Sequence, residues 1–574
     1  MLSTTAPLSP SARAAALDRL AGEELDVLVI GAGVTGAGAA LDAVTRGLRV
    51  GLVEARDFAA GTSSRSTKLF HGGLRYLEQL NFALVFEALK ERSLALNRIS
   101  PHLAHPVPFL YPLRRRVLDR AYAGLGIGVY DVMGAGRGVP HHLRHHGRKK
   151  TLELFPSASR DALVGSIEFY EGQVDDARHT MMLARTAAQY GAAVATSTRV
   201  VGFLREEDRV AGVRVRDLES GRELEIRAKQ TINATGVWIA ELNEMLGGRA
   251  PFTVRASKGV HLVVPRNRIN ARTGLITRTE KSLLFIVPWG AHWIVGTTDT
   301  DWAQDRAHPA ASQADIDYLL GHANQLLADP LTRDDVVGVY AGLRPLLAGE
   351  SDSTSKLSRE HAVASPVRGL VMVAGGKYTT YRVMAADAVD AVVRELPQKV
   401  PASCTEEVPL VGADGYHGLW NARALLAEQT GLRQPVVEHL LKRYGSLLPE
   451  LLGVAEGRPE LLTPLPGAPE YLQVEIVYAA SHEGALHLDD LLARRTRISI
   501  ETWDRGLAAA PEVAALVAPV LGWDAADVAR EVEHYRLRVA AERESQSQPD
   551  DLTADAARLG APDVRMPRPT PGTP

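Results

Sequence analysis

The chain has 574 residues, 45% of them hydrophobic and 23% charged, which is the composition of a globular protein long enough for two or more domains. Its formal net charge of −3 gives no overall reason to expect nucleic-acid binding, so an anion site must be a local cluster of Arg and Lys. Cys404 is the only cysteine, which excludes disulfides within the chain and suits a reducing compartment. No apolar run reaches the roughly 20 residues needed to span a bilayer, and the N-terminus lacks the apolar core of a signal peptide.

A glycine-rich turn near the N-terminus is the strongest local signal. After an arm of about 25 residues, a strand at 26–30 is followed by Gly31, Gly33 and Gly36 in the spacing G-x-G-x-x-G and then by a helix. The first glycine permits a tight turn, the second lets the backbone approach a pyrophosphate, and the third lets the helix pack on the strand. Glu54 ends the second strand at the separation where an acid accepts ribose hydroxyls. This pattern predicts a Rossmann-like dinucleotide site, and the acid disfavours NADP.

The loop GTSSRSTKLFHGG (61–73) helps to distinguish FAD from NAD. Its residues Thr62, Ser63, Ser64, Ser66 and Thr67 can offer hydroxyls and amides to a pyrophosphate and a ribityl chain. A flavoenzyme that is reduced by NADH commonly carries a second dinucleotide fingerprint, and the sequence has none. The pattern therefore favours FAD as the cofactor, with electrons that neither come from NAD nor go to it.

The rest of the chain divides into a mixed middle and a helical end. The stretches VRASKGVHLVVP (254–265) and LLFIVPWGAHWIVGTTD (283–299) are β-rich, and residues 370–396 repeat the order strand, Gly-rich turn, helix. After a Pro-bearing segment the pattern is helical to about residue 545. The last residues, 546–574, are rich in Pro, Asp and small side chains, which is typical of disorder.

Residues 26–103 resemble the N-terminal part of FAD-dependent glycerol-3-phosphate dehydrogenases, and TSSRSTKLFHGGLRYLE (62–78) is the most specific run. Six further matches occur in the family's order. They are EFYEGQVDDAR (168–178), INATGVW (232–238), KGVHLVVP (258–265), PWGAHWIVGTTDT (288–300), YAGLRPL (340–346) and GGKYTTYR (375–382). The resemblance covers about residues 20–400, and the helical C-terminal segment suits the family's extra domain.

The resemblance implies a mixed α/β fold. It predicts a Rossmann-like FAD-binding domain of the D-amino-acid-oxidase/glutathione-reductase type, a β-rich substrate domain and a C-terminal helical domain. The expected boundaries are an N-terminal arm (1–25), the FAD-binding domain interleaved with the substrate-binding domain (26–400), the helical domain (401–545) and a disordered tail (546–574). The substrate-binding part is expected mostly at 105–165 and 241–355.

The resemblance also implies oxidation of sn-glycerol 3-phosphate to dihydroxyacetone phosphate, with hydride passing from C2 to flavin N5 and electrons then passing to membrane quinone. A dianionic phosphate needs several cationic donors, and the planar fork of arginine suits it best. The expected substrate-binding residues are Arg75, Tyr76, Arg344, Arg359 and Lys377. His261 is the first candidate for the catalytic base, because a neutral imidazole accepts a proton near pH 7, and Arg344 is expected to act with it. His71 is the rival base.

The expected cofactor contacts come from the glycine turn, the polar loop and three later turns. They are Gly31, Gly33, Gly36, Glu54, Thr62, Ser63, Ser64, Ser66, Lys68, His71, Gly72, Gly73, Thr235, Gly236, Gly376, Lys377 and Thr379. The helix after GGKYTTY would aim its N-terminal dipole at the reduced flavin, and Lys377 would add positive charge there. No metal site is expected.

Residues 109–133 combine an Arg cluster with Leu, Tyr, Ile and Val, which predicts a segment lying in a membrane interface. We therefore expect a cytoplasmic protein bound peripherally to the inner face of the cell membrane; an ordinary packing helix is the alternative for this segment. Other functions stay open: a soluble oxidase that uses oxygen, or a related FAD enzyme acting on an amine or hydroxy acid. A non-catalytic or nucleic-acid-associated protein would rest only on the basic run 141–150. A homodimer is compatible with the sequence.

Overall fold

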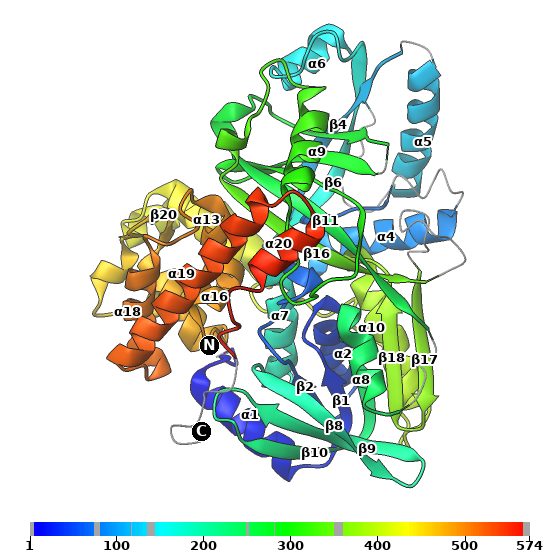
Figure 1. Cartoon of the computed structure of the whole chain (residues 1–574), viewed down its shortest axis with the longest axis vertical. Coiled ribbons are helices and arrows are strands. Elements are labelled where there is room, and N and C mark those ends of the chain that lie inside the picture. Colours follow the sequence, from blue (N-terminus) through cyan, green and yellow to red (C-terminus); the bar gives the residue numbers. More distant parts are fainter. Residues whose placement is uncertain are drawn as a thin grey trace.

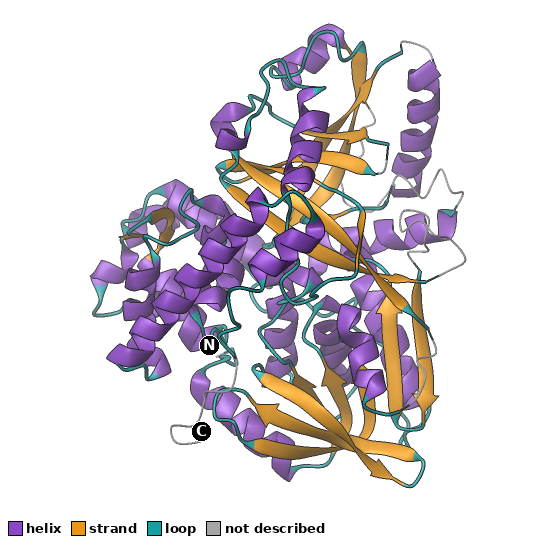
Figure 2. Cartoon of the chain, viewed as in Figure 1, coloured by secondary structure: helices purple, strands orange, loops and turns teal. Residues whose placement is uncertain are grey.

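The computed structural model describes residues 5–73, 81–115, 118–134, 144–247, 252–280, 282–348 and 360–565. The chain forms three parts: one built on an eight-stranded sheet, one built on a ten-stranded sheet and one made mainly of helices, as counted over those residues (Figure 1). Figure 2 shows the strands gathered in the first two parts and helices filling the third. The predicted α/β fold with a C-terminal helical domain is confirmed.

The first sheet carries the glycine turn at the end of its central strand. Its order is β17-β18-β10-β1-β2-β7, and β9 and β8 extend it beyond β10. β1 (Leu25–Ile30) pairs in parallel with β2 (Val50–Val53) and β10 (Glu223–Asn233). All residues of β1 and β2 are buried, as expected for parallel strands covered on both faces. The other strands are β7 (Ala193–Ala195), β8 (Thr198–Glu206), β9 (Arg209–Asp217), β17 (His361–Val367) and β18 (Leu370–Gly375).

Helices from distant parts of the chain cover this sheet. α2 (Val34–Thr45) packs against both α7 (Asp176–Gln189) and α10 (Tyr381–Val393), and it also contacts β1 and β2 (Figure 1). The short helix α8 (Ile239–Glu244) follows β10. The predicted N-terminal arm contains α1 (Pro10–Gly22), which is capped by Ser9 and packs on β7 and β10. The strand–turn–helix order predicted at 370–396 is confirmed by β18 and α10.

The second sheet has the order β15-β11-β14-β13-β12-β4-β6-β3, with β16 beside β11 and β5 beside β6. β11 (Val254–Pro265) pairs antiparallel with β16 (Gly338–Leu347), which sets Ser257 opposite Arg344 and His261 opposite Tyr340. Side chains alternate along β11, so Val260, Leu262 and Val264 enter a core with α9 while His261 points to the other face. Successive side chains of β11 therefore belong in turn to the core and to the candidate site.

The remaining elements of this part complete the sheet and cover it. The strands are β3 (Leu69–Phe70), β4 (Ala104–Leu113), β5 (Arg144–Gly147), β6 (Gly165–Val174), β12 (Gly274–Arg278), β13 (Leu283–Trp289), β14 (His292–Gly296) and β15 (Thr300–Trp302). The helices are α4 (Phe82–Leu94), α5 (Leu118–Gly134), α6 (Arg148–Leu154) and α9 (Gln313–Asn324).

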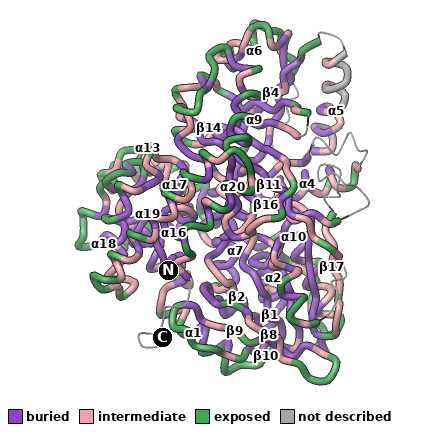
Figure 3. Tube along the Cα trace, in the orientation of Figure 1, coloured by how far each residue is buried: buried purple, intermediate pink, exposed green. Residues whose placement is uncertain are grey.

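The helical part is held to the first sheet by buried ion pairs. Arg178 of α7 pairs with Glu483 at 2.6 Å, and Arg495 pairs with Asp57 at 2.7 Å, with all four side chains nearly inaccessible. Its elements are α11 (Tyr416–Asn421), α12 (Arg423–Thr430), α13 (Gln434–Tyr444), α14 (Leu448–Gly453), β19 (Pro464–Leu465), β20 (Ala468–Leu472), α15 (Gln473–His482), α16 (Leu488–Asp490), α17 (Ile498–Glu501), α18 (Ala510–Leu521) and α19 (Ala525–Ser547). Figure 3 shows buried chain in the interior of all three parts.

One expectation from the sequence is wrong. The tail predicted to be disordered contains α20 (Asp551–Arg558), which crosses in front of β11 and β16 and is drawn in red in Figure 1. Asp551 of this helix forms an ion pair with the buried Lys258, so a tertiary contact orders a polar segment. The predicted interface segment, 109–133, begins in β4, where Phe109 and Leu113 are buried, and continues into α5; its place in a membrane interface stays a prediction. No helix of the described chain is long and apolar enough to cross a bilayer.

Candidate active site

A cavity of about 670 Å³ is lined by residues from both sheets. The first sheet contributes the ends of β1, β2, β10 and β18, and the second contributes β11, β13 and β16. Ligands of open α/β sheets bind at the carboxyl ends of the strands, which is where these four parallel strands end. The cavity therefore has a cofactor side from one sheet and a second side from the other.

The glycine turn fits a pyrophosphate. Gly31 has φ +99°, and a Cβ on it would lie 2.9 Å from Ala234 O, so only glycine is accommodated. Gly33 lines the cavity as the N-cap of α2, and Ser63 Oγ accepts from Val34 N–H at 2.9 Å. Gly36 lies outside the lining: a Cβ there would come within 1.8 Å of Gly31 O. The turn thus presents a helix N-terminus to an anion and keeps side chains out of the way.

Glu54 lines the cavity at the end of β2. Its carboxylate accepts from the backbone N–H of Ala32 and of Arg56, each at 2.8 Å. Burial raises the pKa of this carboxyl, and the two backbone donors act in the opposite direction. Thr198, Arg199 and Val200 line the cavity near it. The acid therefore fastens the glycine turn to β2 at the position expected for the adenosine ribose.

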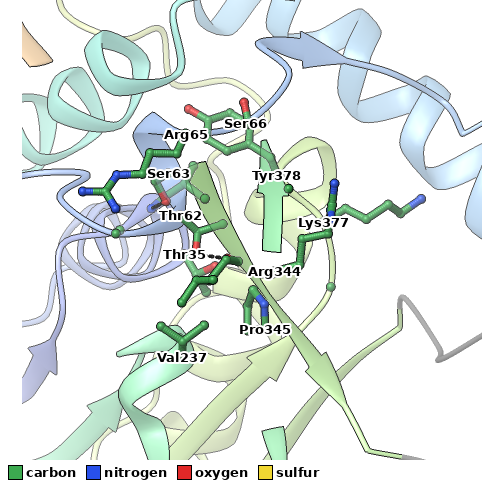
Figure 4. Close-up of a pocket in the computed structure, with 18 of the residues that line it drawn as sticks. Thr35, Thr62, Ser63, Arg65, Ser66, Val237, Arg344, Pro345, Lys377 and Tyr378 are labelled. Carbon is green, nitrogen blue, oxygen red and sulfur yellow. Dashed lines mark hydrogen bonds between the residues drawn. The ribbon is translucent and has the colours of Figure 1, made fainter. Parts of the chain in front are cut away.

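The polar loop divides into residues that face the cavity and residues that support it. Thr62, Ser63 and Ser66 line the cavity and are labelled in Figure 4, together with Arg65. Lys68 does not line it: its Nζ donates to Asp176 Oδ1 at 2.7 Å and to Ser64 O at 3.1 Å. The predicted direct contacts of Lys68 and Ser64 with the cofactor are therefore replaced by a buried support beneath the loop.

The His-Gly-Gly turn is held from below by a buried network. His71 and Gly73 line the cavity, whereas Gly72 packs against Tyr130 and donates its N–H to Tyr130 Oη at 2.8 Å. Tyr130 Oη in turn donates to Glu171 at 2.7 Å, and Arg92 pairs with the same carboxylate. The predicted residues Arg75, Tyr76 and Arg359 lie outside the described residues.

The third group of expected cofactor residues meets at two turns. Thr235 and Gly236 follow β10, and Gly376, Lys377 and Thr379 connect β18 to α10; all five line the cavity. Thr379 Oγ1 accepts from the N–H of His71 and donates to the carbonyl of the same residue, each at 3.2 Å. This contact joins the β18–α10 turn to the His-Gly-Gly turn.

His261 occupies the second side of the cavity and is almost fully buried. Its Nε2 shares a hydrogen bond with Thr67 Oγ1 at 2.9 Å, and its ring stacks on Tyr340 with centroids 4.8 Å apart. Nδ1 is buried without a hydrogen-bond partner among the described residues. Burial, and then the charges of Arg344 and Lys68, hold the pKa of His261 well below its usual value. The imidazole is therefore neutral at physiological pH.

Arg344 lies close to His261 because their strands are neighbours. Its Nη2 donates to Thr297 Oγ1 at 3.0 Å and to Thr298 O at 3.1 Å, and Asp299 lies 3.6 Å from Nη1. Arg344 and Lys377 both line the cavity, and Figure 4 shows the side chain of Arg65 pointing away from Lys377. The cavity thus holds a neutral base candidate beside two cationic side chains.

Sequence reasoning missed several lining residues. They include Arg65, Arg199, Trp238, Arg278, Thr297, Asp299 and Arg306. Arg65 lies in the polar loop, and Thr297 and Asp299 lie in PWGAHWIVGTTDT, so the motifs that contain them were recognised without these positions. Arg199 and Arg278 carry no such local signal, since only strand pairing brings them to the cavity.

The fold and the site define an FAD-dependent oxidoreductase, and the comparisons agree. Residues 26–382 match the family model for FAD dependent oxidoreductases, and residues 403–528 match that for the C-terminal domain of alpha-glycerophosphate oxidase. Glycerol-3-phosphate dehydrogenase 2 of Mycobacterium bovis is 59% identical over 98% of this chain and 96% of its own length. The mitochondrial glycerol-3-phosphate dehydrogenase of Homo sapiens is 36% identical over 95% of this chain and 77% of its own.

Solved structures agree as well. The glycerol-3-phosphate dehydrogenase of Bacillus halodurans, solved with FAD, superposes with a TM-score of 0.76 at 29% identity and covers 93% of this chain and 98% of that chain. The L-alpha-glycerophosphate oxidase of Mycoplasma pneumoniae, with a TM-score of 0.53 at 18% identity, covers 68% of this chain and 99% of its own, and shares the fold. The chain belongs to the FAD-dependent glycerol-3-phosphate dehydrogenase family.

Proposed function

We propose that the chain oxidises sn-glycerol 3-phosphate at C2 to dihydroxyacetone phosphate and delivers the electrons to membrane quinone. The observation that carries this proposal is the placement of His261 and Arg344 on paired strands that face the same cavity as the glycine turn. FAD, when bound, supplies the hydride acceptor of this reaction at flavin N5. The residues of the chain must then hold the phosphate and receive the hydroxyl proton.

Arg344 and Lys377 are the phosphate-binding residues that the described chain supports. Both line the cavity, and they come from different elements, β16 and the β18–α10 turn. Hydrogen bonds to Thr297 and Thr298 fix the guanidinium, which reduces the entropy lost when an anion binds. Arg75, Tyr76 and Arg359 stay proposed members of this set on the strength of the family motifs.

His261 is the proposed base. Its low pKa keeps the imidazole neutral and able to accept a proton, but a neighbouring cation also makes it hold that proton weakly. Arg344 is the second cause of the lowered pKa after burial. A phosphate dianion that pairs with Arg344 offsets this cause, so substrate binding raises the basicity of His261 when a base is needed. Thr67, hydrogen-bonded to Nε2 and itself lining the cavity, is placed to orient the ring.

This assignment is tested by dye reduction with sn-glycerol 3-phosphate, glycerol and an amino acid as alternative substrates. We expect rapid reduction with the phosphate ester and very slow reduction with the other two. Equal rates with glycerol would contradict a phosphate site, and preference for the amino acid would place the chain with the amine oxidoreductases of the same fold.

We further propose that the protein lies in the cytoplasm on the inner face of the cell membrane. Phe82 and Phe86 of α4 are 48% and 50% exposed and stand four residues apart, which puts them on one side of the helix. Arg114 and Arg115, after β4, are exposed, and Asp119 accepts from the backbone N–H groups of both. Exposed aromatic side chains and exposed arginines are each typical of an interface with anionic lipid.

The membrane proposal is tested with the double variant Phe82→Asp/Phe86→Asp and the control Leu425→Asp. Leu425 is 53% exposed on α12 of the helical part, so the control changes a comparable apolar side chain elsewhere. Only the double variant should lose binding to anionic liposomes and quinone reduction, while both keep dye reduction. The alternative acceptor is oxygen. Its support is the match of the C-terminal domain to that of alpha-glycerophosphate oxidase. Fast peroxide formation without quinone reduction or liposome binding would establish that alternative.

A further inference from the structure

A cluster of arginines lies where the C-terminal tail meets the polar loop of the first sheet. Arg65, Arg494, Arg538 and Arg558, which we call the tail cluster, line two adjoining cavities of about 40 and 70 Å³. They come from four separate elements: the polar loop, the turn before α17, α19 and the end of α20. Each cavity exceeds the space that one water molecule needs.

The carboxylates near the tail cluster form ion pairs with only two of its four arginines. Arg494 pairs with Asp57, Asp489 and Asp490, and Arg538 shares Asp489. Neither Arg65 nor Arg558 has a carboxylate within 4 Å among the described residues. The other acids that line these cavities have partners of their own: Glu531 pairs with His487, Asp563 with Arg56 and Glu542 with Arg538.

Arg558 is the most informative member. Only 5% of it is exposed, it ends α20, and its side chain makes no ion pair or hydrogen bond within the described chain. Arg65 is partly exposed, and its side chain donates one hydrogen bond, from Nη1 to the carbonyl of Ala307 at 3.4 Å. Burying a guanidinium without a partner is costly, so Arg558, with the charge of Arg65 beside the same cavities, calls for a compensating anion.

The electrostatics agree with this geometry. Burial, and then the charges of Arg538 and Arg494, lower the pKa of Arg65 to about 9. Burial, and then Arg538, lower the pKa of Arg558 to about 10. Both lowered pKa values have burial as their main cause and neighbouring arginines as the next, which agrees with two guanidinium groups that lack a carboxylate partner within the described chain.

We propose that the tail cluster is a second anion site, which binds a small tetrahedral oxyanion of the inorganic phosphate type between Arg65 and Arg558. Guanidinium forks match phosphate oxygens, and the size of the cavities suits a free oxyanion rather than a larger ester. Arg65 lines both this site and the large cavity, but the two sites differ, because Arg558 does not line the large cavity and Arg344 and Lys377 do not line these. The inference does not depend on the proposed substrate.

An anion in this position would connect the tail to the cofactor loop. Arg65 follows the Thr62–Ser64 turn, whose Ser63 accepts from the first turn of α2, while Arg558 belongs to the tail helix that Lys258 holds through Asp551. The bound oxyanion would therefore bridge two segments that belong to different parts of the fold. Phosphate should slow the release of FAD from the folded protein.

The test counts phosphate sites on the full-length FAD-loaded protein at constant ionic strength, with chloride as the balancing anion. Calorimetric titration with inorganic phosphate should give two sites in the wild type. Arg558→Gln should lose one of them, with phosphate at that site bound about tenfold or more weakly, and should keep the site that Arg344→Gln removes. Arg536→Gln, an exposed arginine of α19 paired with Glu533, is the matched control and should keep both.

FAD release gives a second measurement. Phosphate should slow release in the wild type and in Arg536→Gln but not in Arg558→Gln. If Arg558→Gln does not fold, Arg558→Lys keeps the charge without the fork and should bind phosphate several-fold more weakly. A single phosphate site in the wild type, or two sites of unchanged affinity in Arg558→Gln, overturns the proposal whether or not glycerol 3-phosphate is a substrate.

Discussion

Replacing Arg344 by alanine removes the side chain that couples phosphate recognition to the proposed base. The guanidinium is fixed by Thr297 and Thr298 and has only 21% of its side chain accessible, so water does not readily replace it. A charge-assisted hydrogen bond of this kind contributes about 1.5–3 kcal/mol. We therefore expect kcat/KM for sn-glycerol 3-phosphate to fall by roughly tenfold to 150-fold, with the flavin spectrum unchanged.

The same substitution has a second effect with a defined sign. Arg344 is the larger of the two charges that lower the pKa of His261, so its removal should raise that pKa, while burial still keeps it below the usual value. His261 must be neutral to act as a base. As the pH is lowered, the activity of Arg344→Ala should therefore begin to fall at a higher pH than the activity of the wild type.

Both effects are measured by dye reduction over a pH series, with Arg344→Lys as the control that keeps the charge and loses the planar fork. Arg344→Lys should show a smaller change in the acid limb than Arg344→Ala. Glycerol, which has no phosphate, should be affected far less than the phosphate ester. A loss below about threefold, or an equal loss with glycerol, would refute the role given to Arg344.

Two further predictions concern the cofactor and stability. Gly33→Val should give a folded but colourless protein, because the nearest atom to a Cβ there is Ser63 Oγ at 3.2 Å and the bulk falls on the pyrophosphate; unchanged flavin absorbance would contradict this. Hydrogen bonds from His487 to Glu219 and Glu531 outweigh burial and Arg565 and raise its pKa to about 9. This stabilisation, of order 3 kcal/mol, is complete below about pH 6.5 and is lost as the pH rises through 9. His487→Gln should therefore lower the free energy of unfolding in urea at pH 6 but not at pH 10. An equal loss of stability at both pH values would refute the role given to His487.

Local patterns were sufficient to predict the cofactor half of the fold. The spacing of Gly31, Gly33 and Gly36 states a backbone requirement, since Gly31 has a positive φ and a Cβ on Gly36 would collide with the carbonyl of Gly31. The alternation along β11 likewise predicts which side chains enter the core and which, like His261, do not. Such features depend on neighbours in sequence, so one chain is enough to recognise them.

The features that were missed depend on distant partners. Lys68 looks like any other residue of the polar loop, but Asp176, 108 residues later, draws it beneath the loop. The tail reads as a polar, disordered segment until Asp551 meets Lys258 and Arg565 meets Asp490. Phe109 and its neighbours pair with β6, and that register is absent from their own sequence. Composition alone does not reveal such partners.

The most direct test of the account is anaerobic mixing of the FAD-loaded protein with one equivalent of sn-glycerol 3-phosphate while the flavin absorbance is followed. The account predicts rapid bleaching of the yellow colour, with dihydroxyacetone phosphate formed in equal amount, and no bleaching with glycerol. A flavin that stays oxidised with sn-glycerol 3-phosphate, in protein shown to be folded and loaded with FAD, would contradict it.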